Sequence, residues 1–156
     1  MSEMSKIVKT ISNIAFPLVL IFGLYVIAHG HLTPGGGFQG GAVVASACAM
    51  ILVAYGSVWT MKKIKEKHLS LFESVGAIGF IGLAFLGLLF GLVFFKNFLL
   101  GEGLIFSEIG QGLSNINTAG VLPLMNFAVG LKVIAGLFAI ILVMAYATNK
   151  LKGGEN

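Results

Sequence analysis

A lysine inside an apolar segment is the residue of this sequence best suited to move an ion. Lys132 lies within the run 127–136, about 8 Å of helix rise beyond Phe127. A lysine within a membrane span is costly and usually faces a cavity, a carboxylate or the interior of a helix bundle. Its long stem can also carry the ammonium back to the nearer interface. Lys132 is therefore expected either to face protein and take part in proton or cation movement, paired with a glutamate of another subunit, or to reach the interface.

A second candidate for an ion path is Glu73, which stands near His68 at the start of another apolar segment. An acid close to a helix N-terminus is stabilised by the helix dipole, and this ordinary explanation competes with a proton-relay role. Two further acids, Glu102 and Glu108, lie in the loop 96–120 and are expected to be solvated.

The segment 29–41 combines a proline and a run of glycines, so it predicts a tight turn followed by a smooth helix face. Such a turn can dip into the membrane if protein or water covers its backbone. It then docks another subunit or lines an ion path; the simpler interpretation is an ordinary outer loop. The residues that define it are His29, His31, Pro34, Gly35, Gly36, Gly37, Phe38, Gly40 and Gly41.

His29 and His31 flank this turn and invite a test for metal binding. No Cys, Asp or Glu stands near them in the sequence to complete a coordination shell. We therefore expect an interfacial structural role for the two histidines, with no metal and no cofactor. Nothing in the sequence suggests a catalytic nucleophile or a haem or iron–sulfur ligand set.

The composition requires a membrane around these residues. Of the 156 residues 57% are hydrophobic and 10% charged, and the mean hydropathy is +0.98. The apolar runs are long enough to cross a bilayer as helices. These features exclude an ordinary soluble enzyme and a disordered chain. The sequence predicts an all-α integral membrane protein, one four-helix domain over 1–156, with spans at about 11–28, 38–61, 71–95 and 122–147.

Lysines indicate the orientation of these spans. Eight of the ten positive side chains fall in the N-terminal segment, in the loop 62–67 and at the C-terminus, all on one side of a four-span topology. By the positive-inside rule both termini are expected in the cytoplasm. Because these lysines mark the ends of spans, they indicate topology and not a nucleic-acid partner.

Two features leave alternatives open. The loop 96–120 is expected to be either a surface loop with one short helix or a re-entrant piece. The third span carries glycines whose small size favours close helix contacts, either within a compact monomer or with other subunits. They are Gly76, Gly79, Gly82, Gly87 and Gly91.

The block 23–41 resembles the signature of the MnhB/MrpB family, small membrane subunits of multisubunit sodium/proton antiporters. The pattern G-H-x-x-P-G-G-G-F-x-G-G is matched from Gly30 to Gly41. This block and the stretch 122–132 look most like the archaeal versions of the family, which belong to respiratory complexes with a membrane-bound hydrogenase or sulfane reductase.

The resemblance implies a non-catalytic subunit of an Mrp-type module in the plasma membrane. Its implied partners are other Mrp-type antiporter subunits, a hydrogenase or related redox module, and the lipid bilayer. The implied role is to help form the sodium/proton translocation region, with Lys132 and Glu73 as contributors at most. A purely structural scaffold and a subunit of a free-standing antiporter are the alternatives. An independent carrier is disfavoured because the two halves show no clear repeat.

Overall fold

The computed structural model of the chain describes residues 4–32, 34–99 and 119–153. Within them the chain forms five helices: α1 Lys6–His29, α2 Gly37–Tyr55, α3 Ser57–Lys63, α4 Glu66–Gly91 and α5 Leu122–Gly153. Among the described residues, four helices are long and apolar enough to cross a membrane, namely α1, α2, α4 and residues 122–151 of α5. The prediction of an all-α protein with four membrane spans is therefore confirmed.

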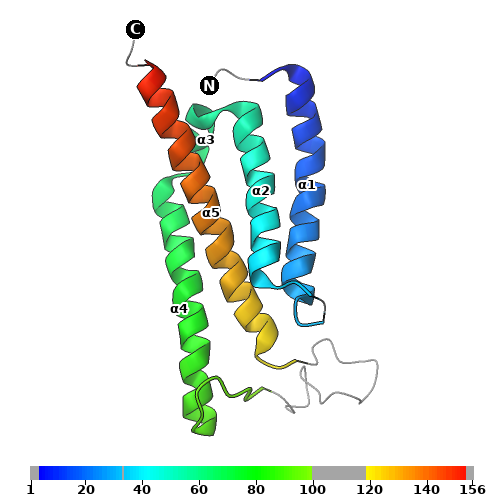
Figure 1. The fold of residues 1–156 in the computed structure, drawn as a ribbon, viewed down its shortest axis with the longest axis vertical. Helices are drawn as coiled ribbons and strands as arrows, with labels where there is room; N and C mark the ends of the chain where they lie inside the picture. The colour runs from blue at the N-terminus through cyan, green and yellow to red at the C-terminus, as the bar shows by residue number, and fades with distance from the viewer. Residues whose placement is uncertain (1–3, 33, 100–118, 154–156) are drawn as a thin grey trace.

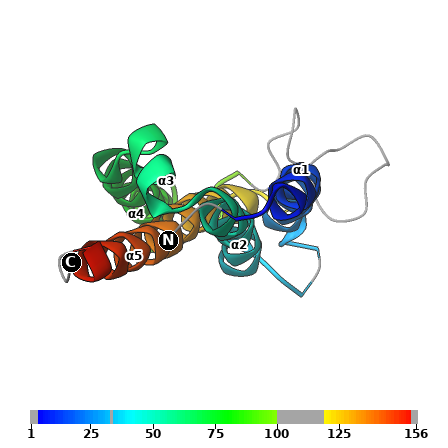
Figure 2. The same ribbon diagram turned by 90° about the horizontal axis from the view of Figure 1, so that it is seen from above.

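The four long helices stand side by side as a curved row in the order α1, α2, α5, α4 (Figure 1). Seen from above, α1 and α4 lie at opposite ends of this row, with α2 and α5 between them (Figure 2). The N-terminal end of α1, the short helix α3 and the C-terminal end of α5 share one end of the molecule (Figure 1). We call this the termini end, and the opposite end, which carries the turn between α1 and α2, the turn end.

The second expected span ends earlier than the sequence suggested. Helix α2 stops at Tyr55 because Gly56 takes a φ of 86°, a backbone conformation that residues with a β-carbon rarely adopt. The chain then turns into α3, which ends at Lys63. Residues 57–61, expected to continue the span, therefore form a separate short helix at the termini end.

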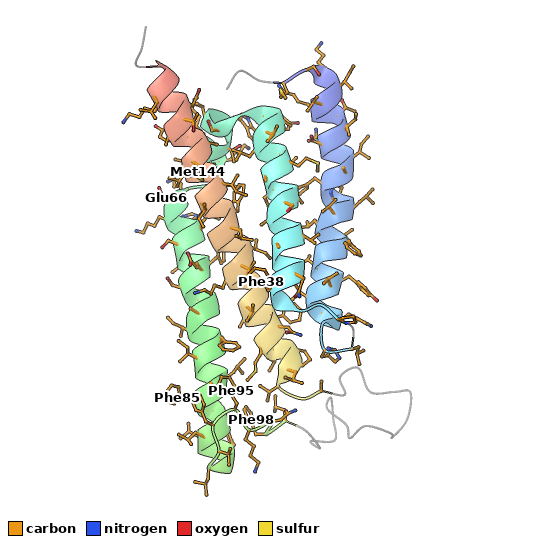
Figure 3. The ribbon with its side chains drawn as sticks, viewed as in Figure 1. Phe38, Glu66, Phe85, Phe95, Phe98 and Met144 are labelled. Carbon is orange, nitrogen blue, oxygen red and sulfur yellow. The ribbon has the colours of Figure 1, made fainter. Side chains whose placement is uncertain are left out.

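At the turn end, the chain folds back along α4 after that helix ends at Gly91. Phenylalanines hold this return in place: Phe85 meets Phe94 at 5.6 Å between ring centroids, and Phe90 stacks on Phe98 at 5.0 Å. Figure 3 shows Phe85, Phe95 and Phe98 gathered at this end of α4. Residues 100–118, which carry most of the loop expected at 96–120 together with Glu102 and Glu108, lie outside the described residues.

Asn97 ties this return to the start of α5. Its side-chain amide donates to the carbonyl of Ala119 at 3.0 Å and its oxygen accepts from the N–H of Val121 at 2.8 Å. Helix α5 begins directly afterwards, with Pro123 in its first turn, where a missing N–H costs nothing.

The outer surface of the row is apolar along all four long helices. Ile7, Ile78 and Leu89 are among many large hydrophobic side chains that are mostly exposed. In water such a surface would aggregate, whereas in a bilayer it meets lipid or the helices of other subunits.

Candidate functional site

The glycine-rich turn depends on one backbone conformation that glycine adopts far more readily than any other residue. Gly35 has a φ of 147°, a conformation that L side chains rarely adopt. The next residue, Gly36, donates its backbone N–H to the side-chain oxygen of Gln39 at 2.9 Å, which satisfies a free donor at the start of α2. The turn therefore fixes where α2 begins.

The glycines that follow let α2 press against two helices at once. A β-carbon at Gly40 would lie 2.7 Å from the carbonyl oxygen of Gly23 in α1, and one at Gly37 would lie 2.9 Å from the backbone nitrogen of Gly130 in α5. Ile27 of α1, only 2% exposed, lies against both Gly40 and Gly130. The glycines thus hold α1, α2 and α5 together at the turn end.

Asn126 of α5 lies against two glycines of this turn. It was not among the candidate residues predicted from the sequence. A β-carbon at Gly30 would come within 3.0 Å of its side-chain nitrogen, and one at Gly36 within 3.3 Å of its side-chain oxygen. The signal available was a lone amide in the first turns of an apolar span, a residue type that bonds across helices in membranes.

The two histidines belong to an aromatic group beside the turn. The ring of His29 stacks on Tyr25 at 4.7 Å and lies 6.3 Å from the ring of His31. The Nδ1 atom of His31 is buried and meets no hydrogen-bond partner among the described residues.

Phe38 behaves differently from the rest of the motif. The glycines at 37, 40 and 41 are buried, whereas Phe38 in the first turn of α2 is 60% exposed. Proline 34 is also exposed. The turn therefore buries its backbone within the chain and turns a large apolar ring outward.

Glu73 and Lys132 come together on the seam between α4 and α5. These helices run antiparallel (Figure 1), and a β-carbon at Gly76 of α4 would lie 3.0 Å from the β-carbon of Lys132 in α5. One turn nearer the termini end, a β-carbon at Gly136 would lie 3.5 Å from the carboxyl carbon of Glu73. The two ionisable residues thus occupy adjacent turns of one glycine-lined contact.

The two side chains differ in how far this chain covers them. Glu73 is half-buried, while Lys132 is exposed. Helix α5 is continuous from Leu122, so Lys132 lies about 15 Å along the helix axis from its first residue. Half of a hydrocarbon core is also about 15 Å. An α5 that enters the core at Leu122 therefore carries Lys132 to mid-depth.

Helix α5 connects the turn and the seam. Asn126, Gly130 and Val133 face α1, α2 or the turn, whereas Ala128, Lys132 and Gly136 face α4. Helix α5 is therefore the element that the turn and the seam share.

Comparisons with known proteins identify the family of this arrangement. A family model described as a domain related to the MnhB subunit of Na+/H+ antiporter matches residues 7–139. A protein of Methanocaldococcus jannaschii without an assigned function is 40% identical over 133 residues, covering 81% of this chain and 48% of its own length. A putative antiporter subunit mnhB2 of Staphylococcus saprophyticus is 40% identical over 55 residues, covering 35% of this chain and 39% of its own length.

A solved structure is similar over nearly the whole chain. A chain of the membrane-bound sulfane sulfur reductase, an archaeal respiratory membrane complex, matches with a TM-score of 0.72 and 30% identity, over 92% of this chain and 59% of that chain. This protein thus spans between about two fifths and three fifths of the length of these relatives. The chain is a multi-pass membrane protein that belongs to the MnhB family of antiporter subunits.

Proposed function

We propose that this chain is a non-catalytic subunit of an Mrp-type sodium/proton antiporter module. We further propose that the module works within an energy-converting respiratory complex of the membrane-bound hydrogenase or sulfane reductase kind. Family membership supports the first part, and similarity to a chain of the sulfane sulfur reductase complex supports the second.

The exposure of Lys132 is the observation that carries the proposal. An ammonium near mid-depth of a bilayer needs a polar partner or a water-filled cavity, and this chain by itself leaves the side chain exposed. Gly76 of α4 lies against the backbone and the β-carbon of Lys132. A neighbouring subunit that brings a carboxylate or a hydrated cavity to the α4–α5 seam would supply what is missing.

In this proposal Glu73 and Lys132 contribute to the ion path. A carboxylate can accept a proton or attract a sodium ion, and an ammonium one turn away disfavours a second cation beside it. The glycines at 76 and 136 let α4 and α5 approach each other closely. At these two positions no bulky apolar side chain stands between the helices beside Glu73 and Lys132. Movement of a cation past Glu73 would then be coupled to the charge on Lys132.

The turn formed by residues 29–41 is proposed to dock a neighbouring subunit. Its buried glycines pack against residues of the same chain, whereas the exposed Phe38 and Pro34 can reach a partner. The alternative is that the turn lines an ion path. The buried Nδ1 atom of His31, which meets no hydrogen-bond partner among the described residues, supports this alternative.

The remaining details concern surroundings and orientation. We propose that the chain resides in the plasma membrane with its termini end in the cytoplasm. This end carries Lys6 and Lys9 of α1, Lys62 and Lys63 of α3, and Lys150 of α5. Such an excess of lysine is typical of cytoplasmic loops. The chemistry of the parent complex would lie in other subunits.

Purification from native membranes in mild detergent tests the assembly. A tagged chain should carry with it several Mrp-type subunits and a hydrogenase-type large subunit, identified by mass spectrometry. Antiporter subunits without a redox partner would indicate a free-standing exchanger instead. A chain that elutes alone and well folded would contradict the subunit proposal.

A further inference from the structure

A groove lies beside α2 at the termini end. Its volume is about 200 Å³, and its lining comes from four helices. Phe16 of α1 forms one wall, Cys48 and Ile51 of α2 and Phe138 of α5 contribute apolar atoms, and α3 closes the groove near the interface. Since Cys48 precedes the end of α2 at Tyr55 by about 10 Å of helix rise, the groove reaches well into the hydrocarbon layer.

The α3 side of the groove carries one charge. Lys63 lines the groove, and its ammonium lies 5.9 Å from the ring centroid of Trp59, another lining residue. The hydroxyl of Thr60, also in the lining, is already bonded to the carbonyl of Gly56 at 3.0 Å. The lining itself is apolar, so Lys63 contributes its aliphatic stem to it, and the ammonium stands beside the groove at the indole ring of Trp59.

Neighbouring residues extend this cationic and aromatic rim. The ring of Trp59 stacks on Tyr55 at 4.6 Å, and the ammonium of Lys9 lies 5.3 Å from the centroid of the Tyr55 ring. The Tyr55 hydroxyl is anchored by Asn13, whose amide donates to it at 2.8 Å. Tyrosine and tryptophan at this level are typical of the membrane interface, and lysines there attract anionic headgroups.

We propose that this groove is a binding site for one anionic phospholipid. The phosphate lies at the rim beside Lys63 and Trp59, and the upper part of a hydrocarbon chain fills the groove down to Cys48. A phospholipid fits because its charge ends at the interface and its apolar part begins there. A membrane-spanning helix of another subunit fits less well, because α3 blocks its continuation at the termini end.

The proposal has a built-in reporter, since Trp59 is the one tryptophan of the chain. The purified full-length chain would be titrated in detergent micelles with phosphatidylglycerol or phosphatidylcholine brominated near the headgroup end of the chain, which quenches nearby indole fluorescence. Half-maximal quenching is expected at an about fivefold lower fraction of the anionic lipid, the effect of one lysine at the surface.

Three variants separate the site from general contact with lipid. Lys63→Gln should abolish the preference for the anionic lipid, whereas Lys67→Gln, in the first turn of α4 and outside the groove lining, should keep it. Cys48→Phe should weaken quenching by both lipids because it fills the groove. Circular dichroism would verify that each variant remains helical. Equal quenching by the two lipids, or a preference unaffected by Lys63→Gln, would overturn the proposal.

A second measurement examines the chain in its native membrane. A benzoylphenylalanine photo-crosslinker at Ile51 in the groove should yield lipid adducts about fivefold richer in anionic phospholipid than the same group at Ile14, an exposed position on α1. A cross-link from position 51 to another protein chain would show that a neighbouring subunit fills the groove. Adducts of the same lipid composition at both positions would also overturn the proposal.

Discussion

Gly76 of α4 lies directly on the backbone of Lys132 of α5: a β-carbon at Gly76 would come within 2.8 Å of the Lys132 amide nitrogen. This contact sets the register of the seam, because Gly136, one turn away, then receives the carboxyl group of Glu73. Glu73 and Lys132 are adjacent for this reason. Their proximity depends on glycine at positions 76 and 136.

Gly76→Ala is therefore expected to disturb the seam. Its new methyl group would overlap backbone atoms of Ala128 and Lys132, which cannot move without shifting a helix. Overpacking of this kind costs about 1–3 kcal/mol. Thermal unfolding of the purified chain should show the loss, and Gly82→Ala is the control because nothing lies within 4 Å of the added group. Equal stability of the two variants would contradict the observed register.

Gly35→Ala should destabilise the turn through the backbone itself. A non-glycine residue at a φ of 147° is strained, at a cost of about 1–3 kcal/mol. Pro34→Ala changes the exposed neighbouring residue without this strain and should cost much less. Unfolding curves of the two variants would be compared. An equal loss of stability in Pro34→Ala and Gly35→Ala would mean that the conformation of the turn does not depend on glycine.

Asn126→Ala is expected to loosen the turn end alone. Removal of the amide leaves Gly30 and Gly36 without the side chain that lies against both. Hydrogen exchange should become faster at residues 30–36 and stay unchanged at the termini end. Asn13→Ala gives the reciprocal control, because it breaks the bond to Tyr55 and should affect only the region of α3. Faster exchange at both ends in either variant would contradict two independent contacts.

Phe38→Ala should weaken assembly while it leaves the fold of the chain intact. The ring is 60% exposed, so its loss removes little packing within the chain but removes a large apolar surface from a proposed docking site. Phe22→Ala is a matched control, since that ring on α1 is 58% exposed and lies outside the turn. Quantitative co-purification compares the two, and a larger loss of partners with Phe22→Ala would argue against docking through the turn.

The spans and the family could be predicted from sequence because both depend on local patterns. Apolar runs of sufficient length predict membrane helices, and the block 30–41 is contiguous. The interruption at Gly56 was not predicted, since glycine is also common inside membrane helices. Its consequence is the groove beneath α3, which no sequence pattern indicated.

Contacts between helices could not be predicted, because they depend on register. The glycines of the third span illustrate this limit. Gly76 faces α5, Gly87 and Gly91 face the chain's own Lys96, and Gly82 faces open space. All four look alike in the sequence, yet only Gly82 is left uncovered among them. For the same reason the contact of Asn126 with the turn emerges only from the crossing of α5 over α2.

Sodium/proton exchange in membrane vesicles that contain the Lys132→Ala complex would show whether Lys132 takes part in ion movement. Lys132→Arg serves as the control that keeps the positive charge, and co-purification verifies that both complexes assemble. We expect the alanine complex to assemble and its exchange rate to fall at least about tenfold, a change of about 1.4 kcal/mol in the barrier. The arginine complex should retain most of the exchange rate. Unchanged exchange in an assembled Lys132→Ala complex would contradict a role of Lys132 in ion movement. The chain would then be a structural scaffold.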